Sequence, residues 1–350
     1  MKKIKIGNRL VGEGEPCFII AEAGSNHNGE LEIAKQLIDI AVKAGADAVK
    51  FQTYSAEKLY SRKTPTMKYL EKERLIKKDE SVWDLIKRIE MPRKWHKPLV
   101  NYCEEREIMF LSTPFDLKAV DELEEVGMAA YKIASFEITH LPLLEYVARK
   151  EKPIILSTGM ADLSDIELAL DTIYEQGNRG VILLHCAVAY PPKYEDLNLR
   201  AMQTMRQAFQ LPVGLSDHTL GITSDIAAVA LGACVIEKHF TLDRKLKGPD
   251  HSFALEPGEL KNMVQAVRDA EASLGCPIKK RTFAEEEMYR LGRRSLIAAC
   301  DISKQTVITK EMVDVKRPGY GIHPEMTDVV IGRVTKVNIE KDDVLTWEMI

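Results

Sequence analysis

Residues that can carry charge or donate hydrogen bonds follow short apolar runs through the first two thirds of the chain. In order, they are Glu22, Lys50 with Gln52, Thr113, Lys132 with Ser135, Ser157, His185, Ser216 with Asp217 and His218, and Glu237 with His239. Two lysines at one place repel each other unless an anion lies between them. Lysines with hydroxyl donors around them therefore predict a phosphate or carboxylate site. For Glu237, a buried ion pair that stabilises the fold is an equally open interpretation.

Two histidines end two successive runs and form a candidate metal pair. His218 and His239 could hold a divalent cation and leave positions for water and substrate, which suits a Lewis acid. The alternative is a pair of buried, hydrogen-bonded imidazoles. Asp250 follows in the turn Gly248-Pro-Asp-His-Ser252, which is either part of the site or a simple turn. Ser157-Thr-Gly-Met160 is interpreted as leading into a helix whose N-terminus can hold an anion.

The elements that must position these residues alternate in type. Eight apolar runs of six to eight residues are typical of strands buried on both faces: 17–23, 46–53, 108–113, 129–135, 153–158, 181–186, 212–217 and 234–240. Amphipathic stretches between them predict helices, of which Leu31–Ala41 closes at Gly45. The pattern predicts a parallel (β/α)8 TIM barrel, in which the carboxyl ends of the strands form one rim. A doubly wound sheet is the alternative, but residues 23–29 lack its GxGxxG turn.

The chain of 350 residues is long enough for a barrel and a second domain. We predict a barrel domain over 1–276, a linker over 277–294 and a small β-rich domain over 295–350, with β-type runs at 296–299, 329–331 and 334–337. The second and third runs are separated by an insertion, residues 55–91, in which Ser81 and Asp84 predict a capping box. This insertion either covers the active site or forms a solvated pair of helices.

Composition narrows the function classes. Hydrophobic residues make up 45% and charged residues 29%, which is typical of a globular protein, and the net charge of −4 argues against binding nucleic acid by bulk charge. No apolar run approaches the length of a membrane-spanning helix, and the N-terminus has no signal-peptide pattern. The six scattered cysteines include no CxxC pair, so we expect reduced thiols and a cytoplasmic protein.

Several motifs in the same order resemble the sialic acid synthase family. They are Phe18-Ile-Ile-Ala-Glu-Ala-Gly-Ser-Asn-His-Asn-Gly29, Val49-Lys-Phe-Gln-Thr53, Ser157-Thr-Gly-Met160, Ser216-Asp-His218, Glu237-Lys-His-Phe240 and Lys316-Arg-Pro-Gly-Tyr-Gly-Ile322. The last of these is similar to the antifreeze-like (SAF) domain of that family. Residues 132–148 and 250–255 look closer still to its spore coat polysaccharide branch.

This resemblance implies an N-acetylneuraminate synthase-type reaction, in which phosphoenolpyruvate condenses with open-chain N-acetylmannosamine or a related N-acetylated hexose and releases phosphate. It implies a divalent ion, Mn2+ or else Mg2+ or Co2+, on His218 and His239, and a homodimer in which the SAF domain covers the partner's barrel. Glu22 would orient the attacking water. The implied phosphoenolpyruvate site is Lys50, Thr113, Lys132, Ser135, Ser157 and Ser216, and the implied sugar contacts are Gln52, Tyr190, Asp250 and Arg317.

One departure from the family pattern leaves the sugar open. Val188 stands where N-acetylneuraminate-forming members often carry an asparagine, and valine cannot make its polar contact. A legionaminate- or pseudaminate-type synthase that uses a 2,4-diacetamido hexose is therefore an alternative. Two others stand beside it: a metal-independent Schiff-base aldolase that acts through Lys132, and a non-catalytic polysaccharide-binding protein.

Overall fold

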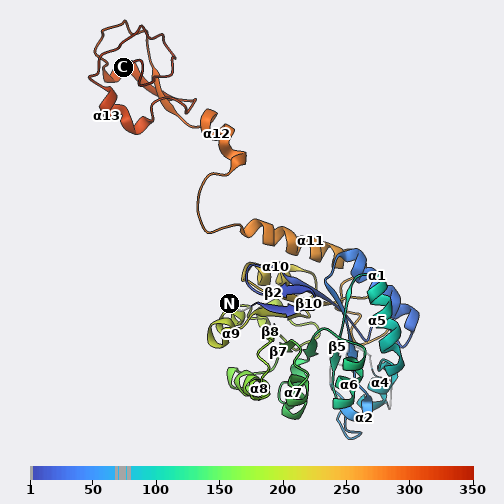
Figure 1. Cartoon of the computed structure of the whole chain (residues 1–350). Coiled ribbons are helices and arrows are strands. Elements are labelled where there is room, and N and C mark those ends of the chain that lie inside the picture. The colour runs from blue at the N-terminus through green and yellow to red at the C-terminus, as the bar shows by residue number, and fades with distance from the viewer. Residues whose placement is uncertain (1–2, 68–69, 71–75, 77–79) are drawn as a thin grey trace. The chain divides into compact units, whose positions relative to one another are not determined.

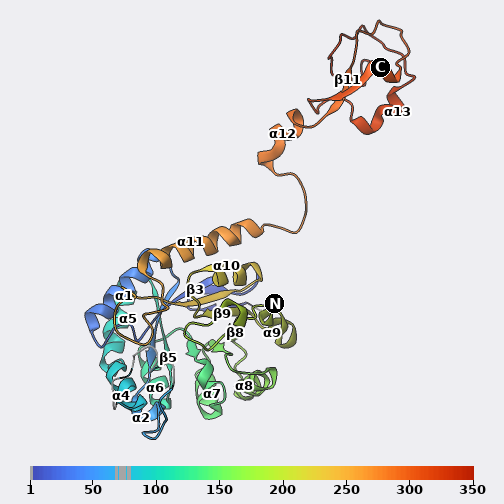
Figure 2. The ribbon, with the colours of Figure 1, turned by 180° about the vertical axis from the view of Figure 1, so that it is seen from behind.

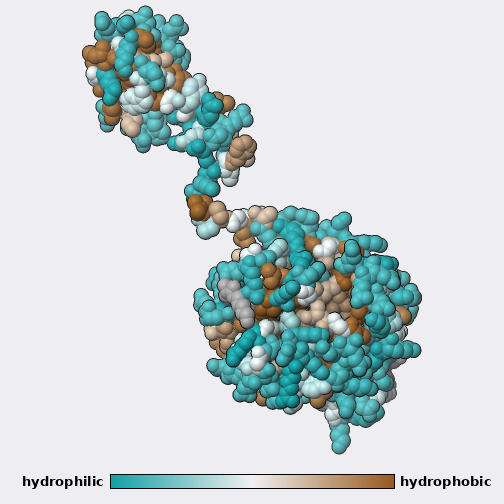
Figure 3. Space-filling view, viewed as in Figure 1, coloured by the Kyte–Doolittle hydropathy of each residue, from teal (hydrophilic) through white to brown (hydrophobic). Residues whose placement is uncertain are grey.

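The computed structural model describes residues 3–67, 70, 76 and 80–350 and divides into two compact units (Figure 1). The first unit is Met1–Gly275 and the second is Cys276–Ile350. Among the described residues, no helix is both long and apolar enough to cross a membrane. On the face of the first unit seen in Figure 3, hydrophilic side chains cover most of the surface.

Eight parallel strands form the centre of the first unit and confirm the predicted barrel. Their order is β5-β4-β3-β10-β9-β8-β7-β6, so the pairing of β10 with β3 joins the last strand to the first. β5 and β6 lie next to each other and complete the ring. The strands are β3 Phe18–Gly24, β4 Ala48–Thr53, β5 Met109–Pro114, β6 Tyr131–Ile133, β7 Ile154–Ser157, β8 Val181–Cys186, β9 Val213–Asp217 and β10 Val235–His239.

Helices surround this barrel, as Figures 1 and 2 show from opposite sides. They are α1 Leu31–Ala44, α5 His96–Glu105, α6 Leu117–Glu125, α7 Leu141–Ala148, α8 Leu163–Glu175, α9 Ala201–Phe209, α10 Thr223–Ala230 and α11 Pro257–Leu274. In α1 the apolar stripe of Ala34, Leu37, Ile38 and Ala41 is buried, as its spacing predicts. Gly45 ends this helix with φ of 82°, a left-handed conformation that glycine adopts without steric cost.

An N-terminal hairpin that the sequence analysis missed packs against the barrel. It consists of β1 Ile4–Ile6 and β2 Arg9–Val11. Ile6 and Val11 are fully buried in the barrel core, and the turn at Gly7 lies against Met109 and Ala129. Met109 begins β5, so the hairpin covers the amino end of the barrel. Strands of three residues carry too little periodicity to be predicted from sequence.

The insertion between β4 and β5 contains α2 Ala56–Leu59 and α4 Val82–Ile89. The predicted capping box at the start of α4 is confirmed: the Ser81 hydroxyl accepts from the Asp84 amide, and the Asp84 carboxylate accepts from the Ser81 amide. Parts of the insertion lie outside the described residues. A separate apolar cluster holds it together, made of Tyr54, Leu70, Val82, Leu85 and Ile89.

The second unit has its own small core. It contains α12 Glu286–Leu291, an antiparallel pair β11 Ser295–Ala298 and β12 Val313–Lys316, and α13 Thr327–Val330. The prediction of a strand at 329–331 is wrong, because Val330 is buried as part of α13. The prediction at 334–337 is also wrong: this segment contributes only an isolated bridge between Val334 and Val307. β-branched residues favour strands, but core packing overrides that preference here.

A buried histidine at the start of α5 generates a prediction about pH and stability. His96 is 3% exposed, and its Nε2 lies 3.0 Å from the Thr53 hydroxyl at the end of β4. Burial lowers the pKa of His96 from 6.5 to about 4, and Arg93 adds to this effect. Because the unfolded chain binds the proton more tightly, the contribution to stability is complete above pH 6.5 and disappears as the pH falls toward 4.

We expect the stability difference between wild type and His96→Gln to shrink by about 3 kcal/mol from pH 7 to pH 4. Denaturant unfolding followed by circular dichroism at each pH measures it. His323→Gln, at an exposed histidine of the second unit, controls for the loss of an imidazole. Parallel pH curves for wild type and His96→Gln would contradict the assignment.

Candidate active site

A cavity of about 470 Å³ opens at the carboxyl ends of the barrel strands. It brings together nearly all of the residues that the sequence predicted for the site. These are Glu22, Lys50, Gln52, Thr113, Lys132, Ser135, Ser157, Tyr190, Ser216, His218, His239 and Asp250. Arg317 belongs to the second unit, and its sugar contact stays a prediction.

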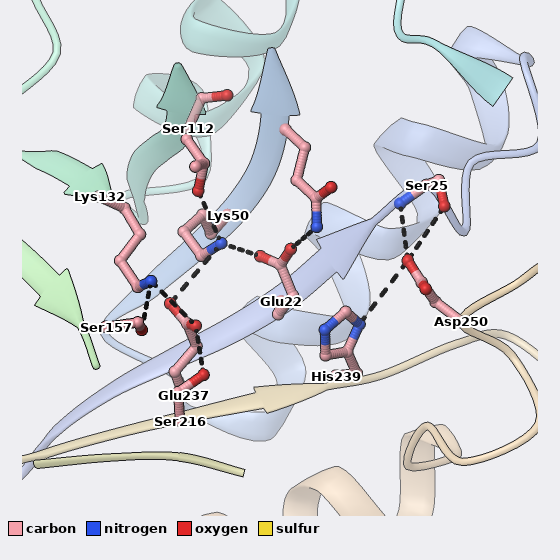
Figure 4. Close-up of polar contacts among 12 residues, drawn as sticks. Glu22, Ser25, Lys50, Ser112, Lys132, Ser157, Ser216, Glu237, His239 and Asp250 are labelled. Atoms are coloured by element: carbon pink, nitrogen blue, oxygen red, sulfur yellow. Dashed lines mark hydrogen bonds and ion pairs between the residues drawn. The ribbon is translucent and has the colours of Figure 1, made fainter. Parts of the chain in front are cut away.

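Two buried lysines share one carboxylate in the deep part of this cavity (Figure 4). Lys50 Nζ and Lys132 Nζ each lie 3.6 Å from an oxygen of Glu237, one on either side of it. Lys50 Nζ also forms an ion pair of 2.7 Å with Glu22, whose other oxygen accepts from Gln52 Nε2 at 2.7 Å. The protein's own carboxylates therefore neutralise the lysines, so a bound anion is not required between them.

The four charges titrate differently because their surroundings differ. Burial raises the pKa of Glu22 to about 7, although Lys50 acts to lower it. Burial also acts to raise the pKa of Glu237, but Lys132 and Lys50 hold it at about 2. Burial lowers the pKa of Lys132, whereas for Lys50 the nearby Glu22 and Glu237 outweigh burial and raise it. Glu237 is thus the fixed negative charge of the group.

Hydroxyl groups surround these charges. Lys132 Nζ donates to Ser157 Oγ at 2.7 Å, and Lys50 Nζ donates to Thr113 Oγ1 at 3.1 Å. Ser216 Oγ donates to Glu237 Oε1 at 2.8 Å. Each hydroxyl comes from the end of a different strand, and each can turn toward a ligand, since a hydroxyl both donates and accepts.

Ser157–Met160 leads into a helix as predicted, because α8 begins at Leu163. The first turn of α8 is acidic, and the Asp165 carboxylate accepts from the Asp162 amide at 2.9 Å, so the protein's own carboxylate occupies this helix N-terminus. The Gly159 amide instead donates to Ser135 Oγ at 2.9 Å. A Cβ at position 159 would clash with Val188, so the valine that departs from the family pattern packs over this glycine.

The two histidines face each other beside the lysines. Their ring centroids are 5.2 Å apart, and the Tyr190 ring packs edge-on against His218 at 4.7 Å. His239 Nδ1 is buried and has no hydrogen-bond partner within the described part of the chain; an oxygen of Asp250 lies 3.9 Å from it. Two imidazoles with a nearby carboxylate fit a divalent cation. However, no three His, Cys, Asp or Glu side chains already converge on a metal position anywhere in residues 3–67, 70, 76 or 80–350.

A buried ionic cluster behind the histidines positions them. Lys238 Nζ pairs with Asp217 and lies 3.7 Å from Asp225. Asp217 also accepts from the Ser224 hydroxyl at 2.7 Å. Since Asp217 precedes His218 and Lys238 precedes His239, the cluster joins the ends of β9 and β10 and sets the spacing of the two imidazoles.

Glu237 was left open between a site residue and a buried ion pair, and the structure makes it both: it lines the cavity and lies 3.6 Å from each lysine. One group of site residues was missed in the sequence. The outer lining from the insertion and its neighbours includes Tyr54, Leu59, Ile86, Ile89 and Phe115. Nothing in their spacing distinguishes apolar residues that line a cavity from apolar residues that fill a core.

Comparison with known proteins agrees with the motifs. Residues 37–279 match the NeuB family and residues 293–350 match the SAF domain. The chain belongs to the NeuB family. It is 44% identical to an N,N'-diacetyllegionaminic acid synthase of Campylobacter jejuni, over 94% of this chain and 98% of that protein. The resemblance to sialic acid-type synthases is thereby confirmed.

Two solved structures share its architecture. The spore coat polysaccharide biosynthesis protein SpsE of Bacillus subtilis matches with a TM-score of 0.69 and 40% identity, covering 100% of this chain and 99% of that one. The N-acetylneuraminic acid synthetase of Leptospira borgpetersenii, solved with citrate, matches with a TM-score of 0.73 and 37% identity, covering 82% and 94%. The names of these relatives refer to different products, so family membership alone does not identify the sugar substrate of this chain.

The shared carboxylate generates a prediction about stability. Glu237→Gln keeps the side-chain volume but leaves two buried lysines without their common counter-charge. We expect the free energy of unfolding to fall by about 3 kcal/mol, which is typical of breaking a buried ion pair. Denaturant unfolding measures this effect. The control is Glu195→Gln, which breaks an exposed pair with Lys193 and should change stability by less than about 1 kcal/mol. Equal losses in both variants would contradict the role of Glu237.

Proposed function

We propose that the protein condenses phosphoenolpyruvate with the open-chain form of an N-acylated amino-hexose and releases phosphate. The observation that carries this proposal is the buried Lys50–Glu237–Lys132 arrangement, ringed by hydroxyls and adjacent to His218 and His239. A small, highly charged anion needs buried cations and hydroxyl donors, and a neutral sugar needs a separate group of polar side chains close by. The cavity offers both kinds of surroundings next to each other.

In this proposal, phosphoenolpyruvate binds in the deep part of the cavity. Lys50 and Lys132 bind its phosphate and carboxylate, because desolvated ammonium groups attract anions strongly. Thr113, Ser135, Ser157 and Ser216 supply the hydroxyl donors. The sugar then lies toward Gln52, Tyr190 and Asp250.

We propose further that His218 and His239, with Asp250 beside them, hold a divalent cation, Mn2+ or else Mg2+ or Co2+. Bound there, such an ion polarises a carbonyl oxygen as a Lewis acid. The unpartnered Nδ1 of His239 supports this assignment. Tyr190 and Phe253 pack against His218 and help to fix its orientation.

The reaction balances without an oxidant or reductant. Carbon 3 of phosphoenolpyruvate forms a bond to the aldehyde carbon, whose oxygen takes up a proton. Water adds to carbon 2, and the bond from that carbon to the phosphate oxygen breaks. Glu22 orients the water and accepts its proton, a role consistent with its raised pKa. Lys50 and Lys132 offset the charge of the departing phosphate.

Phosphate release tests the reaction. After EDTA treatment, the protein with phosphoenolpyruvate and an N-acylated mannosamine should release no phosphate, and Mn2+ should restore release only when the sugar is present. Release without metal would contradict the cation's role. The lowered pKa of Lys132 keeps one rival function open, a Schiff-base aldolase. That rival predicts turnover in EDTA and covalent trapping by borohydride.

Metal binding can be measured without turnover. We expect His218→Ala and His239→Ala each to weaken Mn2+ binding at least tenfold, as read by the electron paramagnetic resonance signal of free Mn2+. His323→Ala, in the second unit, is the control and should bind as wild type does. Unchanged binding in both site variants would place the cation elsewhere.

The resemblance also leads us to propose a homodimer in which the SAF domain covers the partner's barrel and Arg317 contacts the sugar's acetamido group. Light scattering of the full chain tests the dimer, and a monomer at micromolar concentration would contradict it. Arg317→Ala should raise the KM for the sugar and leave the KM for phosphoenolpyruvate unchanged.

A further inference from the structure

The loop over residues 241–255, after β10, carries Asp250. A bridge between Phe240 and Leu255 closes the base of this loop, and most of the residues between them form only turns and bends. Asp250 therefore lies outside the hydrogen-bonded ladder that fixes the strand ends of the barrel. Its position has to be set by side-chain contacts with neighbouring segments.

The loop between β3 and α1 makes such contacts with two successive residues. The Ser25 hydroxyl donates to the Asp250 carboxylate at 3.0 Å (Figure 4). Next along the chain, His251 Nε2 donates to Asn28 Oδ1 at 3.1 Å, and His251 Nδ1 lies 2.6 Å from the Thr241 hydroxyl. The His251 imidazole thus links the start of its own loop to the loop after β3.

The backbone around these contacts allows the close approach that they need. A Cβ at Gly24 would lie 2.9 Å from the Asp250 carboxylate, and a Cβ at Gly248 would lie 2.7 Å from the His251 ring. Asn28 has a φ of 49°, a left-handed conformation that asparagine tolerates better than most residues. The two loops therefore fit together through small or permissive residues at each point of contact.

Asp250 and His251 have different surroundings. Asp250 lines the cavity, and its carboxylate lies 3.9 Å from His239 Nδ1. His251 is fully buried, and the described residues that line the cavity do not include it. A ligand in the cavity would meet Asp250, whereas His251 acts only through the loop that carries Asp250.

We propose that His251 is a positioning residue, which holds the loop after β10 against Asn28 and so keeps the Asp250 carboxylate beside His239. This inference rests on the proposed function, since it concerns the cation site. Without His251, Ser25 alone would hold Asp250, and the carboxylate would spread over more positions. Residues that orient the groups around a metal ion in this way commonly change its affinity tenfold or more, roughly.

Mn2+ binding provides the first test, read by the electron paramagnetic resonance signal of free Mn2+. His251→Ala and Asn28→Gly should each weaken binding about tenfold. Glycine keeps the left-handed conformation at position 28 and removes only the acceptor, so this variant remains informative if His251→Ala folds poorly. The double variant should bind as His251→Ala does, because both changes remove the same hydrogen bond, and losses that add together would overturn the inference.

Tyr194→Phe is the matched control. The Tyr194 hydroxyl donates to the Leu220 carbonyl, a contact between the loops that follow β8 and β9 at the same end of the barrel. Removing it should leave Mn2+ binding unchanged. Wild-type affinity in both His251→Ala and Asn28→Gly would overturn the inference and leave the proposed cation site standing.

Hydrogen exchange of the metal-free protein provides a second test that does not depend on the cation. The Ala254 amide donates to the His251 carbonyl at 3.2 Å, so peptides over residues 244–255 report on the loop. We expect their exchange to be about tenfold faster in both variants, with exchange of α8 unchanged. Unchanged exchange of the loop would overturn the inference. If the wild type bound no Mn2+, the proposed cation site would fall, and the exchange measurement alone would decide whether His251 holds the loop.

Discussion

Charge balance around Glu237 is the constraint on which the site depends. Lys50, Lys132, Glu22 and Glu237 are all at most 5% exposed, and charges so far removed from water are tolerated only with partners. Glu237 lies between the lysines and keeps both in place at the ends of their strands. The positions of the two lysines are therefore fixed by the protein's own carboxylates, and such preorganisation is what an electrostatic site needs.

The barrel and the insertion make separate contributions. Strand ends position the charged and hydroxyl groups with little freedom, because each strand is hydrogen-bonded to its neighbours in the ring. The insertion has its own apolar cluster, distinct from the barrel core, and contributes a carbon-rich surface. A chain organised in this way can keep the polar groups at its strand ends while the insertion changes.

Much of this arrangement was predictable from sequence because a doubly buried strand is apolar throughout and any polar residue at its end stands out. Lys50, Lys132 and His239 were found in that way. The predictions failed where the same short run of residue types is compatible with more than one local structure. Val329 and Val330 favour a strand by their side chains but belong to the helix α13. Ser157–Met160 leads into α8 as expected, but the acidic first turn of that helix does not suit an anion. Whether Leu59 or Ile86 faces a cavity depends on contacts distant in sequence.

The N-terminal hairpin determines which end of the barrel is open to solvent. Because β1 and β2 cover the amino end, with Ile6 and Val11 buried in the core, the cavity exchanges with solvent at the carboxyl end.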